Sequence, residues 1–94
     1  MTAPEKWYDE DKVDDVVLAL LYLNLWEDGR PPLVIYRAWK SFPWEVLDRL
    51  YEKGYIDNPR SKAKSVVFTE EGRRRAEELF FQLFGLDQED NAEE

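Results

Sequence analysis

Hydrophobic residues recur at helical spacing in three segments of the chain. Over residues 11–27 the apolar positions repeat at intervals of three and four, which predicts an amphipathic helix with a broad apolar surface. Residues 43–54 contain a second stripe of this kind, and Gly54 suits the left-handed end of a helix. Residues 69–85 contain a third stripe, for which Thr69 is a suitable N-cap. We therefore expect helices over these three segments.

Further regular structure is predicted between these helices. Residues 33–42 follow paired prolines, with Pro32 near the first helical position, so we expect a short helix of two turns. Residues 55–56 and 65–68 are β-branched or aromatic and are separated by a turn at residues 57–59, so we expect a β-hairpin. The expected fold is mainly α with a small β-hairpin (α+β), in the order helix-helix-helix-strand-strand-helix.

The charge is distributed unevenly along the 94 residues. The formal net charge is -8, yet residues 29–85 contain eleven Lys and Arg against eight Asp and Glu, so the excess of acids lies at the two ends. Acidic ends with few packing residues are typical of frayed termini. We expect an acidic N-terminal arm over residues 1–10, one domain over residues 11–86 and an acidic tail over residues 87–94.

The sequence lacks the residues on which much enzyme chemistry depends. It contains no Cys and no His, which excludes thiolate zinc sites, cysteine nucleophiles and Ser-His-Asp catalysis. All four Gly stand at the ends of predicted elements, so no Gly-rich phosphate loop is present. The acids of residues 9–15 lack the spacing of an EF-hand and are interpreted as a solvated helix start. We expect no enzyme activity, no cofactor and no metal site.

The sequence shows no segment suited to crossing a membrane. The chain begins with an acidic stretch, whereas a signal peptide has a basic start followed by an apolar run. The longest apolar run, at residues 16–26, is much shorter than the ~20 residues of a membrane helix. We expect a soluble cytoplasmic protein with no membrane partner.

Residues 47–80 resemble a segment of two groups of bacterial transcription regulators. The stretch LDRLYEKGYIDNPRSKAKSVVFTEEGRRRAEELF contains a Lys-Gly at a helix end, an apolar strand, a basic loop and a Thr-Glu before the next helix. This order is similar to the MarR and PadR groups. The resemblance implies a winged helix-turn-helix that binds DNA, with the helix over residues 43–54 as its recognition helix.

A closer similarity covers more of the chain. Residues 37–72, RAWKSFPWEVLDRLYEKGYIDNPRSKAKSVVFTEEG, are similar to a family of short bacterial proteins of unknown function, in which a Trp-Lys, a further Trp and the KAKSVV run recur. The similarity extends from Val13 to Phe84. It supports a small bacterial family with this scaffold but implies no particular activity.

The basic side chains of the predicted β-hairpin, which would form the wing, suit contacts with phosphate. Arg60, Lys62 and Lys64 alternate with small residues, so their side chains could project to one side and bind DNA phosphates without sequence preference. An edge strand that its charges protect from aggregation is an equally good interpretation. The other candidates for a nucleic-acid contact are Arg37, Lys40 and Ser41.

The opening of the predicted recognition helix does not suit base recognition. Phe42 and Trp44 offer neither a donor fork for guanine nor an amide for adenine, and Glu45 would meet phosphate with the wrong sign. Bulky aromatic groups at this position favour contact with a protein instead. The predicted protein contact comprises Trp39, Phe42, Trp44 and Glu45.

The apolar surface of the first and last helices exceeds what one core would bury. This excess favours a homodimer through the terminal helices. The residues expected at the dimer interface are Leu18, Tyr22, Leu25, Phe81 and Leu86.

These patterns support two hypotheses of different classes. The favoured one is a non-enzymatic protein-interaction module on a winged-helix scaffold, which binds an unidentified partner protein. Such a module would be regulatory or would inhibit a nucleic-acid-binding machine. The alternative is a duplex-DNA-binding transcription regulator of the MarR/PadR-like type.

Overall fold

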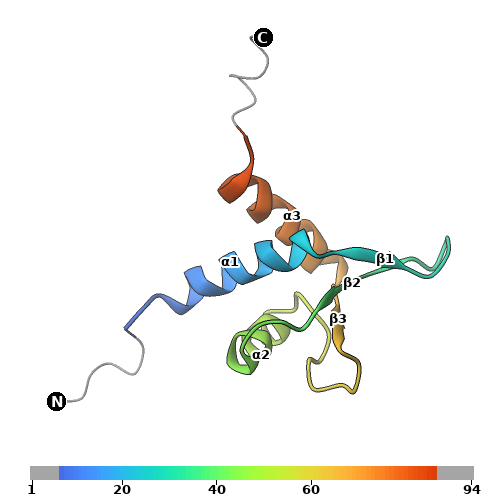
Figure 1. The fold of residues 1–94 in the computed structure, drawn as a ribbon, viewed down its shortest axis with the longest axis horizontal. Helices are drawn as coiled ribbons and strands as arrows, with labels where there is room; N and C mark the ends of the chain where they lie inside the picture. The colour runs from blue at the N-terminus through green and yellow to red at the C-terminus, as the bar shows by residue number, and fades with distance from the viewer. Residues whose placement is uncertain (1–6, 87–94) are drawn as a thin grey trace, which may run out of the picture.

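The computed structural model describes residues 7–86 and combines helices with a small antiparallel sheet. Over these residues the elements follow the order α-β-β-α-β-α (Figure 1). This result confirms an α+β fold, but the predicted order of elements is wrong. The elements are α1 (Glu10–Leu23), β1 (Trp26–Asp28), β2 (Ile35–Trp39), α2 (Trp44–Glu52), β3 (Ser65–Val67) and α3 (Glu70–Phe84).

Local capping determines where the helices begin and end. The Asp9 carboxylate accepts the backbone N–H groups of Asp11 (3.0 Å) and Lys12 (3.2 Å), which starts α1. The Thr69 hydroxyl accepts the N–H of Gly72 at 2.9 Å and starts α3 in the same way. Gly54, with a φ of 86°, follows α2 in the left-handed region. The three long helices predicted from the hydrophobic pattern are confirmed, although α1 is shorter than expected.

The predicted helix over residues 33–42 is wrong, because this segment contains the central strand of the sheet. Strand β2 pairs with β1, where Arg37 opposes Trp26, and with β3, where Arg37 opposes Val67. A two-turn helix is marginal by itself, whereas a central strand gains hydrogen bonds along both edges. The predicted pair of consecutive helices over residues 33–54 therefore does not form.

The predicted hairpin is correct in one strand and wrong in its partner. Residues 65–67 form β3, but β3 pairs with β2, and the sheet order is β1-β2-β3. Ile56 meets Phe68 only in an isolated bridge. The segment between α2 and β3 is instead a loop that returns along the start of α2.

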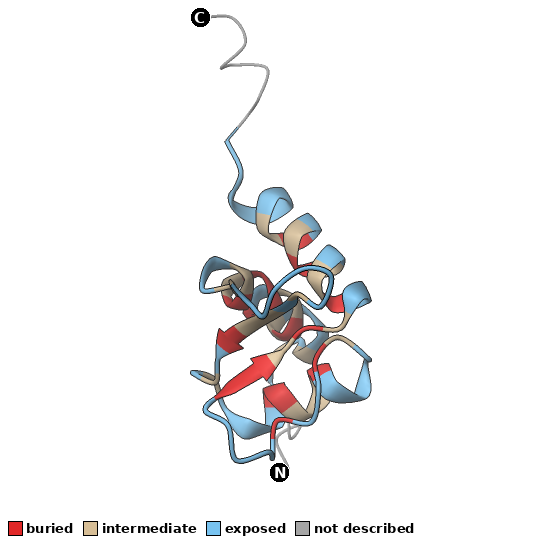
Figure 2. Ribbon diagram, turned by 90° about the vertical axis from the view of Figure 1, so that its right-hand side faces the viewer, coloured by how far each residue is buried: buried red, intermediate tan, exposed pale blue. Residues whose placement is uncertain are grey.

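One hydrophobic core lies where α1 meets the other helices and the sheet. Helix α1 contacts both α2 and α3 and lies between them (Figure 1), and the buried residues gather where the elements meet (Figure 2). Removal of these side chains from water is the main stabilising contribution to the fold. The core residues are Val17, Leu18, Ala19, Leu21, Ala38, Val46, Leu47, Leu50, Ile56, Val66, Phe68, Ala76 and Leu79.

A buried carboxylate joins α1 to α2. Asp14 is fully buried, and Arg49 donates to it from Nε (3.0 and 2.9 Å) and from Nη2 (2.8 Å). Lys53 adds a hydrogen bond of 3.0 Å from its ammonium group. A buried charge needs such partners, because its desolvation is costly. This cluster fixes α2 against α1, and thereby fixes the start of α2 relative to the sheet.

The predicted terminal segments fall largely outside the described residues. Residues 1–6 of the predicted acidic arm and residues 87–94 of the predicted tail are not described by the structure. The predicted domain over residues 11–86 lies within the described part, and α1 begins one residue before it.

Candidate binding surface

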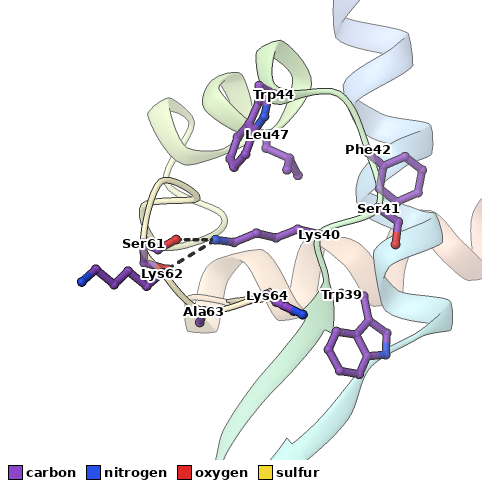
Figure 3. A pocket seen from close by; sticks show the side chains of 10 residues that line it. All are labelled: Trp39, Lys40, Ser41, Phe42, Trp44, Leu47, Ser61, Lys62, Ala63 and Lys64. Carbon is purple, nitrogen blue, oxygen red and sulfur yellow. Dashed lines mark hydrogen bonds between the residues drawn. The ribbon is translucent and has the colours of Figure 1, made fainter.

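A groove of about 650 Å³ lies between the start of α2, the end of β2 and the loop before β3. Its walls come from segments that are distant in the sequence, and the side chains that line it are drawn in Figure 3. The lining residues are Trp39, Lys40, Ser41, Phe42, Trp44, Leu47, Ser61, Lys62, Ala63 and Lys64.

A short connection between β2 and α2 brings two tryptophans to this groove. The Lys40 N–H donates to the Lys64 carbonyl at 3.0 Å, which extends the pairing of β2 with the chain before β3. The Pro43 carbonyl then accepts the N–H groups of Val46 and Leu47 and opens α2. Only four residues separate the last residue of β2, Trp39, from the first of α2, Trp44, so both rings lie at the mouth of the groove.

Both tryptophans are half exposed and are held by neighbouring side chains. Trp39 is 52% exposed, and its ring centre lies 4.8 Å from that of Trp26 on β1. Trp44 is 50% exposed, with the guanidinium carbon of Arg60 at 4.7 Å and the Lys40 ammonium at 5.8 Å from its ring centre. These ring and cation–π contacts order the indoles while leaving much of their surface in water.

Lys40 connects the end of β2 to the loop before β3, which forms the opposite side of the groove. Its ammonium donates to the Ser61 carbonyl at 3.0 Å and to the Ser61 hydroxyl at 3.4 Å (Figure 3). This contact crosses the groove and holds the loop in place. The groove is therefore formed by the fold itself.

A second ion pair anchors the same loop to α2. Arg60 donates to the Asp48 carboxylate at 2.7 Å from Nη2 and at 3.3 Å from Nε. The hydrogen bond from Arg60 lowers the pKa of Asp48 below its ordinary value, and it raises the pKa of Arg60. The Asn58 side chain accepts the Arg60 N–H at 2.8 Å, which shapes the turn that leads to this pair.

The structure brings together two residue sets that the sequence analysis kept apart. Trp39 and Trp44 from the predicted protein contact border the groove, and Phe42 lines it while packing partly against the core. Glu45 is exposed but does not line the groove. From the predicted nucleic-acid set, the residues that line the same groove are Lys40, Ser41, Lys62 and Lys64.

The other two bases of the nucleic-acid set are partnered by acids. Arg37 donates to Asp28 at 2.8 Å and to the Ser65 hydroxyl at 3.0 Å, and Arg60 is paired with Asp48. Sequence reasoning missed Leu47, Ser61 and Ala63 as lining residues. Their contribution depends on the loop folding back onto α2, for which the local sequence contains no signal.

The predicted dimer residues separate into buried and exposed positions. Leu18 is fully buried in the core of its own chain, so its assignment to a subunit interface is wrong. Tyr22 is partly buried, with ring contacts to Phe80 and Phe81, and Leu25 is partly buried against the core. Phe81 is exposed near the end of α3, which projects from the body (Figure 2), and Leu86 is exposed just after that helix.

A known protein family matches almost the whole of the described fold. Residues 9–86 match the family described as "Domain of unknown function (DUF6429)". The chain belongs to the DUF6429 family. A relative in this size range, "Uncharacterized protein y4hR" of Sinorhizobium fredii (strain NBRC 101917 / NGR234), is 53% identical over 76 residues, which cover 81% of this chain and 93% of that protein. No solved structure matches.

The DUF6429 match includes every residue of the groove. It spans α1 to the end of α3, and thus also the buried Asp14 cluster. Within the described residues, none of the helices combines the length and apolarity needed to cross a membrane. The expectation of a small uncharacterised family is confirmed.

Proposed function

We propose that this DUF6429 protein is a non-catalytic binding module that contacts a partner protein through the groove bordered by Trp39 and Trp44. The observation that carries the proposal is the half-exposed state of both indoles on either side of a preformed hollow of about 650 Å³. Tryptophan is the side chain most enriched among residues that dominate protein interfaces. Ordered indoles lose little conformational freedom on binding, which favours this use.

The proposal is tested by comparing partner recovery between variants of the full chain. Trp39→Ala and Trp44→Ala each remove one of the indole rings that border the groove. Trp7→Ala is the control, because Trp7 is 83% exposed and lies outside the groove. We expect the two groove variants to lose a partner that wild type and Trp7→Ala retain. Equal recovery by all four proteins would show that this surface is not the binding site.

The alternative function is duplex-DNA binding by a regulator of the MarR/PadR-like type. It is favoured by Lys62 and Lys64, which are exposed beside the start of α2. Sequential α2, β3 and α3 keep the helix–wing–helix order of the resemblance, although the wing has a single strand that pairs with β2. A gel shift with random duplex at low salt tests it, with loss expected in Lys62→Glu/Lys64→Glu. The absence of a gel shift with the wild-type protein would refute this alternative.

We also propose that two copies associate through the end of α3. Residues 79–84 of α3 contain no charged side chain, so this part of the helix is apolar on more than the face that packs against α1. The exposed apolar residues at this end of α3 and just after it are Phe81, Leu83, Phe84 and Leu86. A second copy would cover them with the same surface, as in a two-fold interface.

A further inference from the structure

The groove has a charge opposite to that of the chain. Three lysines, Lys40, Lys62 and Lys64, line it, and none of its lining residues is Asp or Glu. The chain as a whole contains 21 Asp and Glu against 13 Lys and Arg. A hollow with low-dielectric walls and one sign of charge attracts ligands of the other sign. The charge of the lining therefore favours an anionic occupant.

Two of the three lysines are available to such an occupant. The side chains of Lys62 and Lys64 make neither a hydrogen bond nor an ion pair with the described residues, whereas Lys40 is held by Ser61. Lys62 points away from the body of the groove, and Lys40 crosses it (Figure 3). Arg60 nearby is paired with Asp48 and adds little net charge. The unpaired ammonium groups are thus on the loop side of the groove.

The remaining lining is apolar and aromatic. Leu47 is 1% exposed and closes one side, and Trp39 and Trp44 flank the opening. An apolar side chain placed between the two indoles would lose most of its contact with water, which is favourable. An occupant that matches both the apolar lining and the unpaired lysines combines one apolar side chain with neighbouring carboxylates.

We infer that the groove takes an acidic peptide segment of a partner protein, with an apolar side chain against Trp39 and Trp44 and carboxylates at Lys62 and Lys64. This inference rests on the proposed function and names the class of partner. A single-stranded nucleic acid fits less well, because it stacks successive bases on open aromatic platforms. A single apolar side chain needs only the part of the two rings that remains exposed. The Trp39 ring already packs on Trp26, and the guanidinium of Arg60 lies over the Trp44 ring.

The experiment selects peptides from a random library on the immobilised full chain and measures the affinity of the selected peptides by fluorescence anisotropy. We expect Asp and Glu to be enriched over the input library beside an apolar position. Binding should fall about tenfold or more in Trp44→Ala and in Lys62→Glu/Lys64→Glu, and it should weaken between about 50 and about 300 mM salt.

A matched control separates local charge from total charge. Arg30→Glu/Arg74→Glu changes the net charge by the same amount at two exposed residues that do not line the groove. We expect this control to bind the selected peptides within about twofold of wild type. An equal loss in both double variants would show that general repulsion, and not the groove, determines the affinity.

The other outcomes distinguish this inference from the proposed function. Selected peptides that require Trp44 but contain no excess of acids would leave the groove as a protein-binding site and overturn the acidic class. A library that yields no binding peptide would overturn the acidic-peptide inference alone. Peptides that bind Trp39→Ala and Trp44→Ala as tightly as wild type would overturn the placement of both proposals at this groove. Tighter binding of a single-stranded oligonucleotide than of the selected peptides would assign the groove to nucleic acid instead.

Discussion

Arg49 on α2 donates three hydrogen bonds to the fully buried carboxylate of Asp14 on α1, the shortest of them at 2.8 Å. The same carboxylate also accepts from Lys53. The structure thereby satisfies a buried charge with cations whose side chains remain partly in water. Because α2 supplies one wall of the groove, this contact connects the stability of the fold to the geometry of the binding surface.

Removal of the Asp14 charge should destabilise the fold strongly. We expect Asp14→Asn to lower the free energy of unfolding by about 3 kcal/mol, because Arg49 and Lys53 lose the partner that compensates their desolvation. Urea unfolding followed by circular dichroism measures the change. Asp11→Asn is the control, since Asp11 contacts Lys53 but its side chain is 85% exposed, and its effect should stay within about 0.5 kcal/mol. Equal effects in the two variants would contradict the role assigned to the buried cluster.

A methyl group at Gly72 should not be accommodated. A Cβ at this position would overlap the Tyr55 carbonyl oxygen, because α3 begins in close contact with the chain after α2. We expect Gly72→Ala to cost about 1–3 kcal/mol of the free energy of unfolding, as the backbone must shift. Arg74→Ala on the exposed side of the same helix should change it by less than about 0.5 kcal/mol. Thermal unfolding of both variants provides the measurement, and an unchanged midpoint for Gly72→Ala would contradict the close approach.

The Asp48–Arg60 pair should titrate in the acid range. The hydrogen bond from Arg60 lowers the pKa of Asp48 in the folded chain below 3.8, so the folded chain binds this proton less readily than the unfolded chain. The contribution of the pair to stability is therefore complete above pH 3.8 and is lost as the pH falls through the lower, folded pKa. In Arg60→Gln, an NMR titration of the Asp48 carboxyl carbon should show the pKa rising toward 3.8. Arg74→Gln should leave it unchanged, and a shift of equal size there would point to general charge instead of the pair.

The exposed end of α3 should determine the oligomeric state. We expect wild type to elute as a dimer and Phe81→Asp/Phe84→Asp as a monomer in light-scattering measurements, because buried charges would oppose the apolar contact. Leu33→Asp is the control for an added surface charge, since Leu33 is 78% exposed in the turn between β1 and β2, which lies apart from the end of α3 (Figure 1). A monomeric wild type over the whole concentration range would refute the proposed dimer.

The helices could be predicted because their signals are local. Asp9 and Thr69 cap helices through atoms two or three residues away, and Gly54 ends a helix by its own backbone angle. The apolar stripes of the helices likewise repeat within a few turns. Such features depend on neighbours in the sequence, so the pattern alone is sufficient.

The candidate surface was only partly predictable. The sequence predicts Trp39 and Trp44 as contact residues, because bulky aromatic groups stand where a base-reading protein carries polar ones, and the structure leaves both half exposed. Their position beside Lys62 and Lys64 required the loop to fold back, which the Lys40–Ser61 and Arg60–Asp48 contacts accomplish. The pattern also assigned Leu18 to an interface, because periodicity cannot tell an internal partner from an external one.

Residue types and short-range spacing are sufficient to predict the three helices, the cap at Thr69, the helix end at Gly54, the acidic ends and the absence of Cys and His chemistry. The central position of strand Ile35–Trp39 and the groove that two sets of residues share depend on contacts between segments distant in the sequence. The physical reason is the origin of the stabilising contacts. A central strand is stabilised by hydrogen bonds from chains distant in sequence, and a groove is formed by whichever walls those pairings bring together.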